Sequence, residues 1–306
     1  MTRDAAVLRC RPRYEGANIR TWVGFKHFMY LVEEAVLHWF RSRGYGPQRL
    51  YHEHGLGLEI VDESVQLPAV LEVDDEVEAE VDRVADRLFA VRLRVERDGQ
   101  PVTVLRGKVA VALIPERTAG VPPAPPPELA ALVTTARVPP GLDASVDGVG
   151  APSPGAFRWS WPASYVLCHF SDRVQHSGYV RALEVTVDRF LASVGISVGR
   201  MLAERSWIPV VSRARVRMLA PARMEETVHT TFAVDDMVRD MMFGGRMTCH
   251  VERRGAWVPV ATASILHAYA VSAGPAAGSL ATLDDGVIAA LTGTRAVAPV
   301  GVGVSA

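Results

Sequence analysis

Residues 24–44 read GFKHFMYLVEEAVLHWFRSRG, and residues 176–195 read HSGYVRALEVTVDRFLASVG. Both stretches are apolar on nearly every side, and each ends at a glycine, which commonly terminates a helix. A constant offset of 151 positions aligns them, placing Phe28 on Tyr179, Glu33 on Glu184 and Gly44 on Gly195. A helix that is apolar all round must be buried. The sequence therefore predicts two buried helices in corresponding places of a duplicated chain.

Long alternating segments follow each helix. Apolar and polar residues alternate in LEVDDEVEAEV (71–81) and FAVRLRVERDG (89–99), and again in RARVRMLAPARMEETVHTTFAV (213–234) and RMTCHVERRG (246–255). A period of two is typical of half-buried strands, and VERDG and VERRG predict matching hairpin turns. Each half closes with a Val- and Ala-rich strand, VTVLRGKVAVALI (102–114) or VPVATASILHAYAV (258–271). The shared order of elements predicts an internal repeat.

The repeat sets the expected domains. Residues 1–116 and 156–273 form the two units, and the Pro- and Gly-rich stretch 117–155 reads as a linker with room for one helical turn near ELAALV. The tail, 274–306, is expected to be mobile apart from a short helix at LDDGVIAAL.

The composition excludes several classes of protein. With 306 residues, 49% of them hydrophobic, and a formal net charge of −1, the chain has a globular mix and no nucleic-acid footprint. Three cysteines without metal spacing predict no metal site and suit a reducing cytoplasm. Neither a signal peptide nor a membrane span is expected. Only two of the 33 basic residues are lysines, Lys26 and Lys108, which is typical of a GC-rich bacterial genome.

The simplest way to bury each helix is a curved antiparallel sheet wrapped around it. The predicted fold class is α+β, with one long antiparallel sheet around one buried helix in each half. This arrangement resembles the hot-dog fold, and two units in tandem imply a double hot-dog, in which the sheets join edge to edge as an internal pseudo-dimer. Further homo-oligomerisation stays open.

Short motifs at the second helix narrow the resemblance. The stretch from His176 to Glu184 resembles H-x-N-Y-x-x-x-x-E of the 4-hydroxybenzoyl-CoA thioesterase family, with Gly178 in place of Asn. Asp172-Arg-Val-Gln-His176 is similar to D-x-N-x-H of acyl-ACP thioesterases, with Val174 in place of Asn. In the first half, Asn18 is similar in position to the catalytic-loop residue of these families, which is Asn in enediyne-type members.

The resemblance implies hydrolysis of an acyl thioester carried by CoA or acyl carrier protein, in polyketide or fatty-acid metabolism and without a cofactor. The implied catalytic residues are Asp172, His176, Glu184 and Asn18. Asp172 could activate water or attack directly, and His176 could orient it or move a proton. Replacing Asp172 by Ala is then expected to slow hydrolysis at least about 100-fold. The alternative interpretation is structural. Asp172 and His176 would then cap the start of the helix, Glu184 would be a structural carboxylate, and Asn18 would occupy a turn.

Other residues are candidates for binding. A helix N-terminus offers unpaired amides and a positive dipole end, so Ser177, Gly178 and Tyr179 are oxyanion-hole candidates. Trp22 and Phe25, with Phe28, could wall an acyl pocket, although a core role is favoured for such a cluster. Arg213, Arg215 and Arg217 share one strand face and could grip phosphates or an acidic carrier protein, although a solvated face is favoured.

Two other functions stay open. Hot-dog hydratases and dehydratases also use His and Asp, but their D-x-N-P-x-H and H-x-F-P motifs are absent here. A non-catalytic acyl-binding module is the third reading, because Phe25 and Thr21 of the first half cannot do the work of His176 and Asp172. Release of a free thiol separates hydrolysis from hydration.

Overall fold

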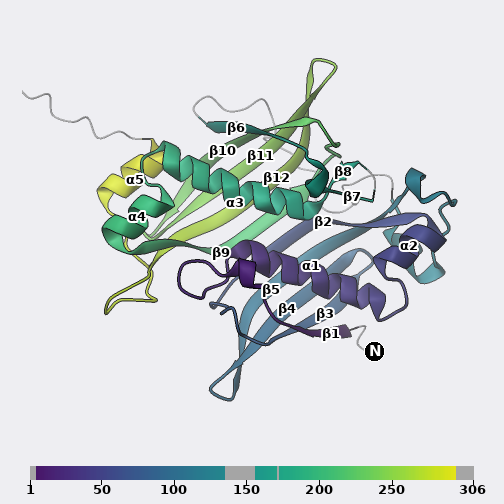
Figure 1. The fold of residues 1–306 in the computed structure, drawn as a ribbon, viewed down its shortest axis with the longest axis horizontal. Helices are drawn as coiled ribbons and strands as arrows, with labels where there is room; N and C mark the ends of the chain where they lie inside the picture. The colour runs from purple at the N-terminus through teal and green to yellow at the C-terminus, as the bar shows by residue number, and fades with distance from the viewer. Residues whose placement is uncertain (1–4, 135–155, 171, 294–306) are drawn as a thin grey trace, which may run out of the picture.

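The computed structural model describes residues 5–134, 156–170 and 172–293. One ten-stranded sheet, with the order β1-β3-β4-β5-β2-β9-β12-β11-β10-β6, runs through both halves (Figure 1). The first half contributes β1 (Ala5–Cys10), β2 (Leu56–Gln66), β3 (Val77–Ala85), β4 (Leu88–Arg97) and β5 (Gln100–Pro115). The second contributes β6 (Phe157–Pro162), β9 (Trp207–Met218), β10 (Thr227–Val238), β11 (Met242–Arg253) and β12 (Ala256–Val271). The strand order of one half mirrors that of the other.

Helices α1 (Phe25–Arg41) and α3 (His176–Ser193) lie side by side in front of the sheet in Figure 1. Short helices follow each one, α2 (Pro47–His54) and α4 (Val198–Arg205), and α5 (Asp285–Thr292) packs near α4. A short hairpin, β7 (Cys168–His169) with β8 (Arg173–Val174), precedes α3. Short 3-10 helices occupy Tyr14–Gly16, Arg117–Ala119, Pro127–Leu132 and Tyr165–Leu167.

The two halves meet at β2 and β9, which pair antiparallel from Asp62–Arg217 to Gln66–Arg213. Ser64 lies opposite Arg215 at the middle of this pairing, and these positions differ by the same 151 residues that align the helices. Above the sheet, Arg181 of α3 donates a hydrogen bond to the hydroxyl of Tyr30 of α1 at 2.8 Å. This pair is again separated by 151 residues, so both contacts lie on a pseudo-twofold axis. The predicted edge-to-edge pseudo-dimer is confirmed.

The helices form where the sequence predicts them because their apolar residues fill the concave face of the sheet. Trp39 and Phe40 of α1 pack edge-on against each other and are fully buried. Gly44 and Gly195 adopt φ of 79° and 83° just after the helices, which favours glycine. The predicted hairpin turns also form, with positive φ at Asp98 and Gly99 and at Arg254 and Gly255.

Two segments differ from the expectation. The alternating stretch 71–81 is a strand only from Val77, because Leu71 to Glu76 form the connection into β3. The described part of the linker is not a free spacer, since Leu129 and Leu132 are fully buried and Arg87 donates to the carbonyl of Ala131 at 2.8 Å.

The beginning of the tail is also packed. Leu283, Val287 and Leu291 are buried at helical spacing, and Asp284 caps α5 by accepting from the amide of Val287 at 3.0 Å. The short helix predicted at LDDGVIAAL is therefore present and docked, whereas the predictions for 135–155 and 294–306 concern residues outside the described ranges. Among the described helices, none is long and apolar enough to span a membrane.

Candidate active site

The N-terminus of α3 lies buried at the seam between the two halves. Helix α3 begins at His176, and its N-cap residue, Gln175, makes no side-chain capping bond. His176 and Ser177 are 4% and 7% exposed. An uncapped first turn leaves backbone N–H groups without intrahelical partners and a positive dipole end. Such donors are what an oxyanion needs, but the amide of Gly178 already donates to the carbonyl of Gln175 at 3.0 Å, so the oxyanion-hole role of this helix start stays a prediction.

The imidazole of His176 points down onto the β2–β9 junction. Its Nε2 lies 3.4 Å from the carbonyl oxygen of Val216, and its Nδ1 lies 3.5 Å from Oε2 of Glu63, the residue opposite Val216. A carbonyl can only accept, so Nε2 carries the proton and Nδ1 presents a lone pair to Glu63. Burial lowers the pKa of His176 to about 4, so the ring is neutral at pH 7.

Glu63 is the residue that the sequence analysis missed. Its side chain is fully buried, and neither carboxyl oxygen has a hydrogen bond within the described part of the chain. Burial raises the pKa of Glu63 well above its usual value, with further contributions from Glu33 and Asp62. Burial thus favours the protonated form of Glu63, beside a neutral imidazole. The available signal was a carboxylate within the apolar run LGLEIVDESV of a central strand.

Glu33 of α1 belongs to the same cluster. It is partly exposed, and burial raises its pKa to about 7, with Glu34 adding to the rise and Arg181 opposing it. A carboxylate of this pKa is half ionised at neutral pH and is a stronger base than an ordinary glutamate. Unlike Glu63, it combines basicity with access to water. The first half therefore contributes two carboxyl groups of different exposure that are close enough to be coupled electrostatically.

Glu184, the predicted helix carboxylate, has a different environment. Its Oε2 lies 2.6 Å from Nζ of Lys26, which stands in the first half where Ser177 stands in the second. Glu184 and Glu33 are equivalent in the repeat. The Lys26–Glu184 ion pair therefore corresponds to Ser177 and Glu33 at the other helix start. A catalytic role for Glu184 stays a prediction, but the geometry favours Glu33.

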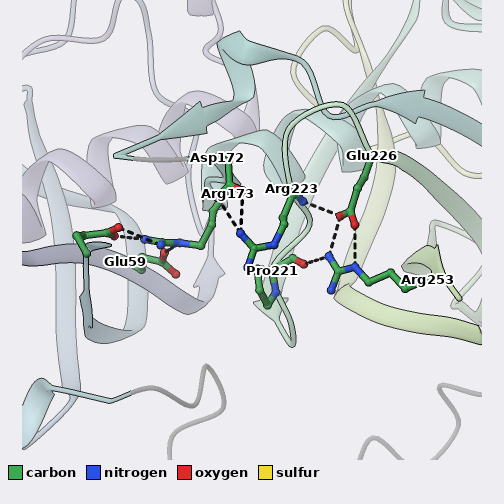
Figure 2. A network of polar contacts seen from close by, with 8 residues as sticks. Glu59, Asp172, Arg173, Pro221, Arg223, Glu226 and Arg253 are labelled. Carbon is green, nitrogen blue, oxygen red and sulfur yellow. Dashed lines mark hydrogen bonds and ion pairs between the residues drawn. The ribbon is translucent and has the colours of Figure 1, made fainter. Parts of the chain in front are cut away.

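Asp172 lies at the surface in the loop before α3 (Figure 2). Its two carboxyl oxygens accept hydrogen bonds from Nη1 of Arg223 at 3.0 and 2.7 Å, and its side chain is 46% exposed. At the equivalent place in the first half, Thr21 donates a hydrogen bond to Glu72. Each half therefore ties the loop before its long helix to the equivalent strand connection, β2–β3 in the first half and β9–β10 in the second, but with different side chains. The structure places His176 next to Glu63, whereas Asp172 pairs with Arg223 at the surface. The geometry therefore favours a role for Asp172 in anchoring the loop.

This arrangement makes the role of Asp172 measurable. We expect Asp172→Ala to lower kcat/KM for thioester hydrolysis less than about tenfold, because an exposed ion pair is worth at most about 1 kcal/mol. Stopped-flow thiol release would show it. A loss of about 100-fold or more, with an unchanged melting temperature, would restore the catalytic interpretation drawn from the D-x-N-x-H resemblance.

The next residue, Arg173, anchors the same loop in the opposite direction (Figure 2). Its Nε donates to Oε1 of Glu59 at 2.7 Å, and Nη1 donates to Oε2 of Glu116 at 3.1 Å. Side-chain exposure is 11% for Arg173 and 1% for each glutamate. Because both glutamates belong to the first half, this buried network fixes the start of α3 against its neighbour.

The remaining predicted site residues divide between the two helix starts. Asn18 is exposed, and its amide lies against Gly24, the N-cap of α1, not against α3. Gly178 does not open onto a substrate, because a Cβ there would meet Val174 at 3.0 Å. Tyr179 is fully buried and packs against Trp161.

The aromatic and arginine candidates serve packing and pairing. Phe25 is 8% exposed in the hydrophobic core, and Trp22 is stacked by the guanidinium of Arg20 at 4.9 Å. Arg215 forms a two-bond ion pair with Asp62, which agrees with the structural alternative, while Arg213 is exposed. Within the described residues, no group of three or more His, Cys, Asp and Glu side chains could hold a metal ion.

Comparisons with known proteins identify the fold. No protein-family model and no curated protein matches the sequence. Among solved structures, the chain is similar to the 12:0-ACP thioesterase of Umbellularia californica, with a TM-score of 0.62, 12% identity and coverage of 87% of this chain and 94% of that one. It is also similar to an acyl-ACP thioesterase of Bacteroides thetaiotaomicron, with a TM-score of 0.54, 12% identity and coverage of 86% and 98%. These similarities confirm the predicted double hot-dog fold.

Proposed function

We propose that this chain hydrolyses acyl thioesters at the seam between its two halves. One observation carries the proposal: Glu33 of α1, with a pKa of about 7, lies within electrostatic reach of Arg181 of α3 and of Glu63, the carboxyl group next to His176. The Lys26–Glu184 pair has Ser177 and Glu33 as its counterparts in the repeat, which supports a position of Glu33 beside the first turn of α3. The site therefore combines a base from one half with oxyanion donors from the other.

The chemistry follows from these groups. The amides of His176 and Ser177 at the start of α3 bind the thioester carbonyl oxygen, and Glu33 removes a proton from a water whose oxygen attacks the carbonyl carbon. The resulting oxyanion collapses, the carbon–sulfur bond breaks, and the thiolate leaves with the electron pair. The proton held by Glu33 passes to this thiolate, which yields a carboxylic acid and a free thiol. His176 and Glu63 hold the floor of the site in one protonation state.

The substrate class is part of the proposal. Both structurally similar proteins named above are acyl-ACP thioesterases, which supports an acyl group on a carrier-protein or CoA thiol. Polyketide or fatty-acid metabolism is the proposed setting. Cys10, Cys168 and Cys249 are free thiols, which supports action in a reducing cytoplasm.

A second function is favoured by one specific observation. A neutral imidazole at His176 lies beside the carboxyl group of Glu63, whose raised pKa favours the protonated form. A base next to an acid is what dehydration of a β-hydroxyacyl thioester requires. His176 would remove the proton next to the carbonyl, and Glu63 would protonate the departing hydroxyl. Against this, both ring nitrogens already face the sheet.

One substrate panel tests both functions. The full chain is assayed with short, medium and aryl thioesters on CoA and on carrier protein, with Ellman's reagent for free thiol and ultraviolet absorbance for the enoyl thioester. We expect thiol release. Interconversion of β-hydroxyacyl and enoyl thioesters without thiol release would favour the dehydratase, and binding of every thioester without turnover would refute both enzymatic proposals.

A further inference from the structure

Four exposed cations stand on the face of the sheet away from the helices, the face turned from the viewer in Figure 1. They are Arg92 of β4, Arg106 and Lys108 of β5, and Arg213 of β9. None of the four has an ion pair or hydrogen bond among the described residues, although Arg215 on the same face is paired with Asp62. This group of four is here called the outer basic cluster.

The strand register places these cations in one row. Arg92 lies directly opposite Arg106, Arg106 lies opposite Gln66, and Gln66 lies opposite Arg213. Directly opposed side chains have Cβ atoms about 4.5–5.5 Å apart, and opposed like charges destabilise a sheet. Glu80 lies opposite Arg92 on its other side, but its carboxylate is paired with Arg94. Arg106 lies between Arg92 and Gln66 with no carboxylate directly opposite it, so the repulsion between the two arginines costs stability. An anion between the two guanidinium groups would remove that cost.

A hollow coincides with the row. Its volume is about 490 Å³, within the range of small-molecule sites, and its lining includes Arg92, Arg106, Lys108, Ser64 and Gln66. Glu80 and Asp82 of β3 also line the hollow. Neither carboxylate is free, and Glu80 is paired with Arg94 at 3.3 Å. The lining thus combines three cations, two neutral hydrogen-bonding side chains and two carboxylates that already have partners.

We propose that the hollow of the outer basic cluster binds a diphosphate group of a nucleotide-sized ligand. Guanidinium forks match phosphate oxygens in a bidentate geometry, and Lys108 adds a point charge. The hydroxyl of Ser64 and the amide of Gln66 complete the set of donors. The hollow lies on the opposite face of the sheet from His176 and Glu33, so this site is separate from the proposed catalytic site and independent of it.

The test is calorimetric titration of the full chain with inorganic pyrophosphate at low ionic strength. We expect saturable binding that weakens as salt is added. Arg106→Gln should weaken binding at least about tenfold, because a hydrogen bond to a charged group is worth about 1.5–3 kcal/mol. The matched control is Arg117→Gln, an exposed, unpaired arginine about 30 Å further along the chain, which should leave binding within about twofold.

A second readout separates ligand binding from a structural role. Without anion, Arg106→Gln should melt at the same temperature as the parent chain or higher, because the opposed arginines no longer repel. If ADP binds with the affinity of pyrophosphate and CoA binds no more tightly than ADP, the diphosphate comes from a free nucleotide. If CoA binds more tightly than ADP, the diphosphate is that of CoA. Equal pyrophosphate binding in both variants, or none, overturns the proposal. An acidic carrier protein that binds in an Arg106-dependent manner where pyrophosphate does not would assign the surface to a protein partner.

Discussion

Glu33→Gln should lower kcat/KM for thioester hydrolysis by about 10²–10⁴-fold, the usual contribution of a general base. Glutamine has the size of glutamate but cannot accept the proton of the attacking water. The amides of α3 and the neighbouring Glu63 stay in place, so substrate binding should change little. Single-turnover thiol release, with KM and kcat determined separately, would place the loss in kcat.

The repeat supplies the matched control for this variant. Glu184 occupies the same helix position in the other half and is neutralised by Lys26 at 2.6 Å. Glu184→Gln removes an equal side chain from an equal place, and we expect its kcat/KM to stay within a few-fold of the parent value. Equal losses in the two variants would refute a special role for Glu33 and indicate a structural role for both carboxylates.

The pH dependence gives an independent check with a definite sign. The pKa of Glu33 is raised to about 7, so kcat/KM should rise with pH as the carboxylate ionises near neutrality, and Glu33→Gln should remove that limb. The same shift acts on stability in the opposite direction. The folded state holds the Glu33 proton more tightly than the unfolded chain, so its contribution is present below about pH 4.5 and is lost as pH rises through about 7. Glu33→Gln should therefore unfold at a higher temperature than the parent chain at pH 8.

The duplicated fold could be predicted because its signals are local. The all-round apolar stretches 24–44 and 176–195 must be buried wherever they lie, and the two-residue turns at 98–99 and 254–255 fix their hairpins. Gly44 and Gly195 mark helix ends through their own backbone preference. None of these inferences needs a contact between distant parts of the chain.

The site could be predicted only in part, because its chemistry depends on contacts between the halves. The start of α3 was found from the motif at His176. The environment of His176, however, is set by Glu63, 113 positions earlier in the chain, through the β2–β9 register. Asp172 and Arg173 are adjacent in sequence, yet one ion pair is exposed and the other is buried. Burial decides what such a charge can do, and a motif does not record it.

That contrast between adjacent ion pairs leads to the largest expected effect on stability. Arg173→Met should destabilise the folded chain by about 3–5 kcal/mol, because it leaves the carboxylates of Glu59 and Glu116 buried without their countercharge. Methionine keeps most of the aliphatic volume, so the loss comes from charge and not from a cavity. Denaturant unfolding at pH 7 would measure it.

The control and the rescue both lie in the same network. Arg223→Met removes the partner of Asp172, an ion pair whose two side chains are 53% and 46% exposed, and should cost at most about 1 kcal/mol. Adding Glu59→Gln and Glu116→Gln to Arg173→Met removes the stranded charges and should recover most of the lost stability. If Arg173→Met costs no more than Arg223→Met, the network is not a buried clamp between the halves. If the cost is large but the double glutamine change recovers nothing, packing of the Arg173 side chain, and not its charge, holds the start of α3 in place.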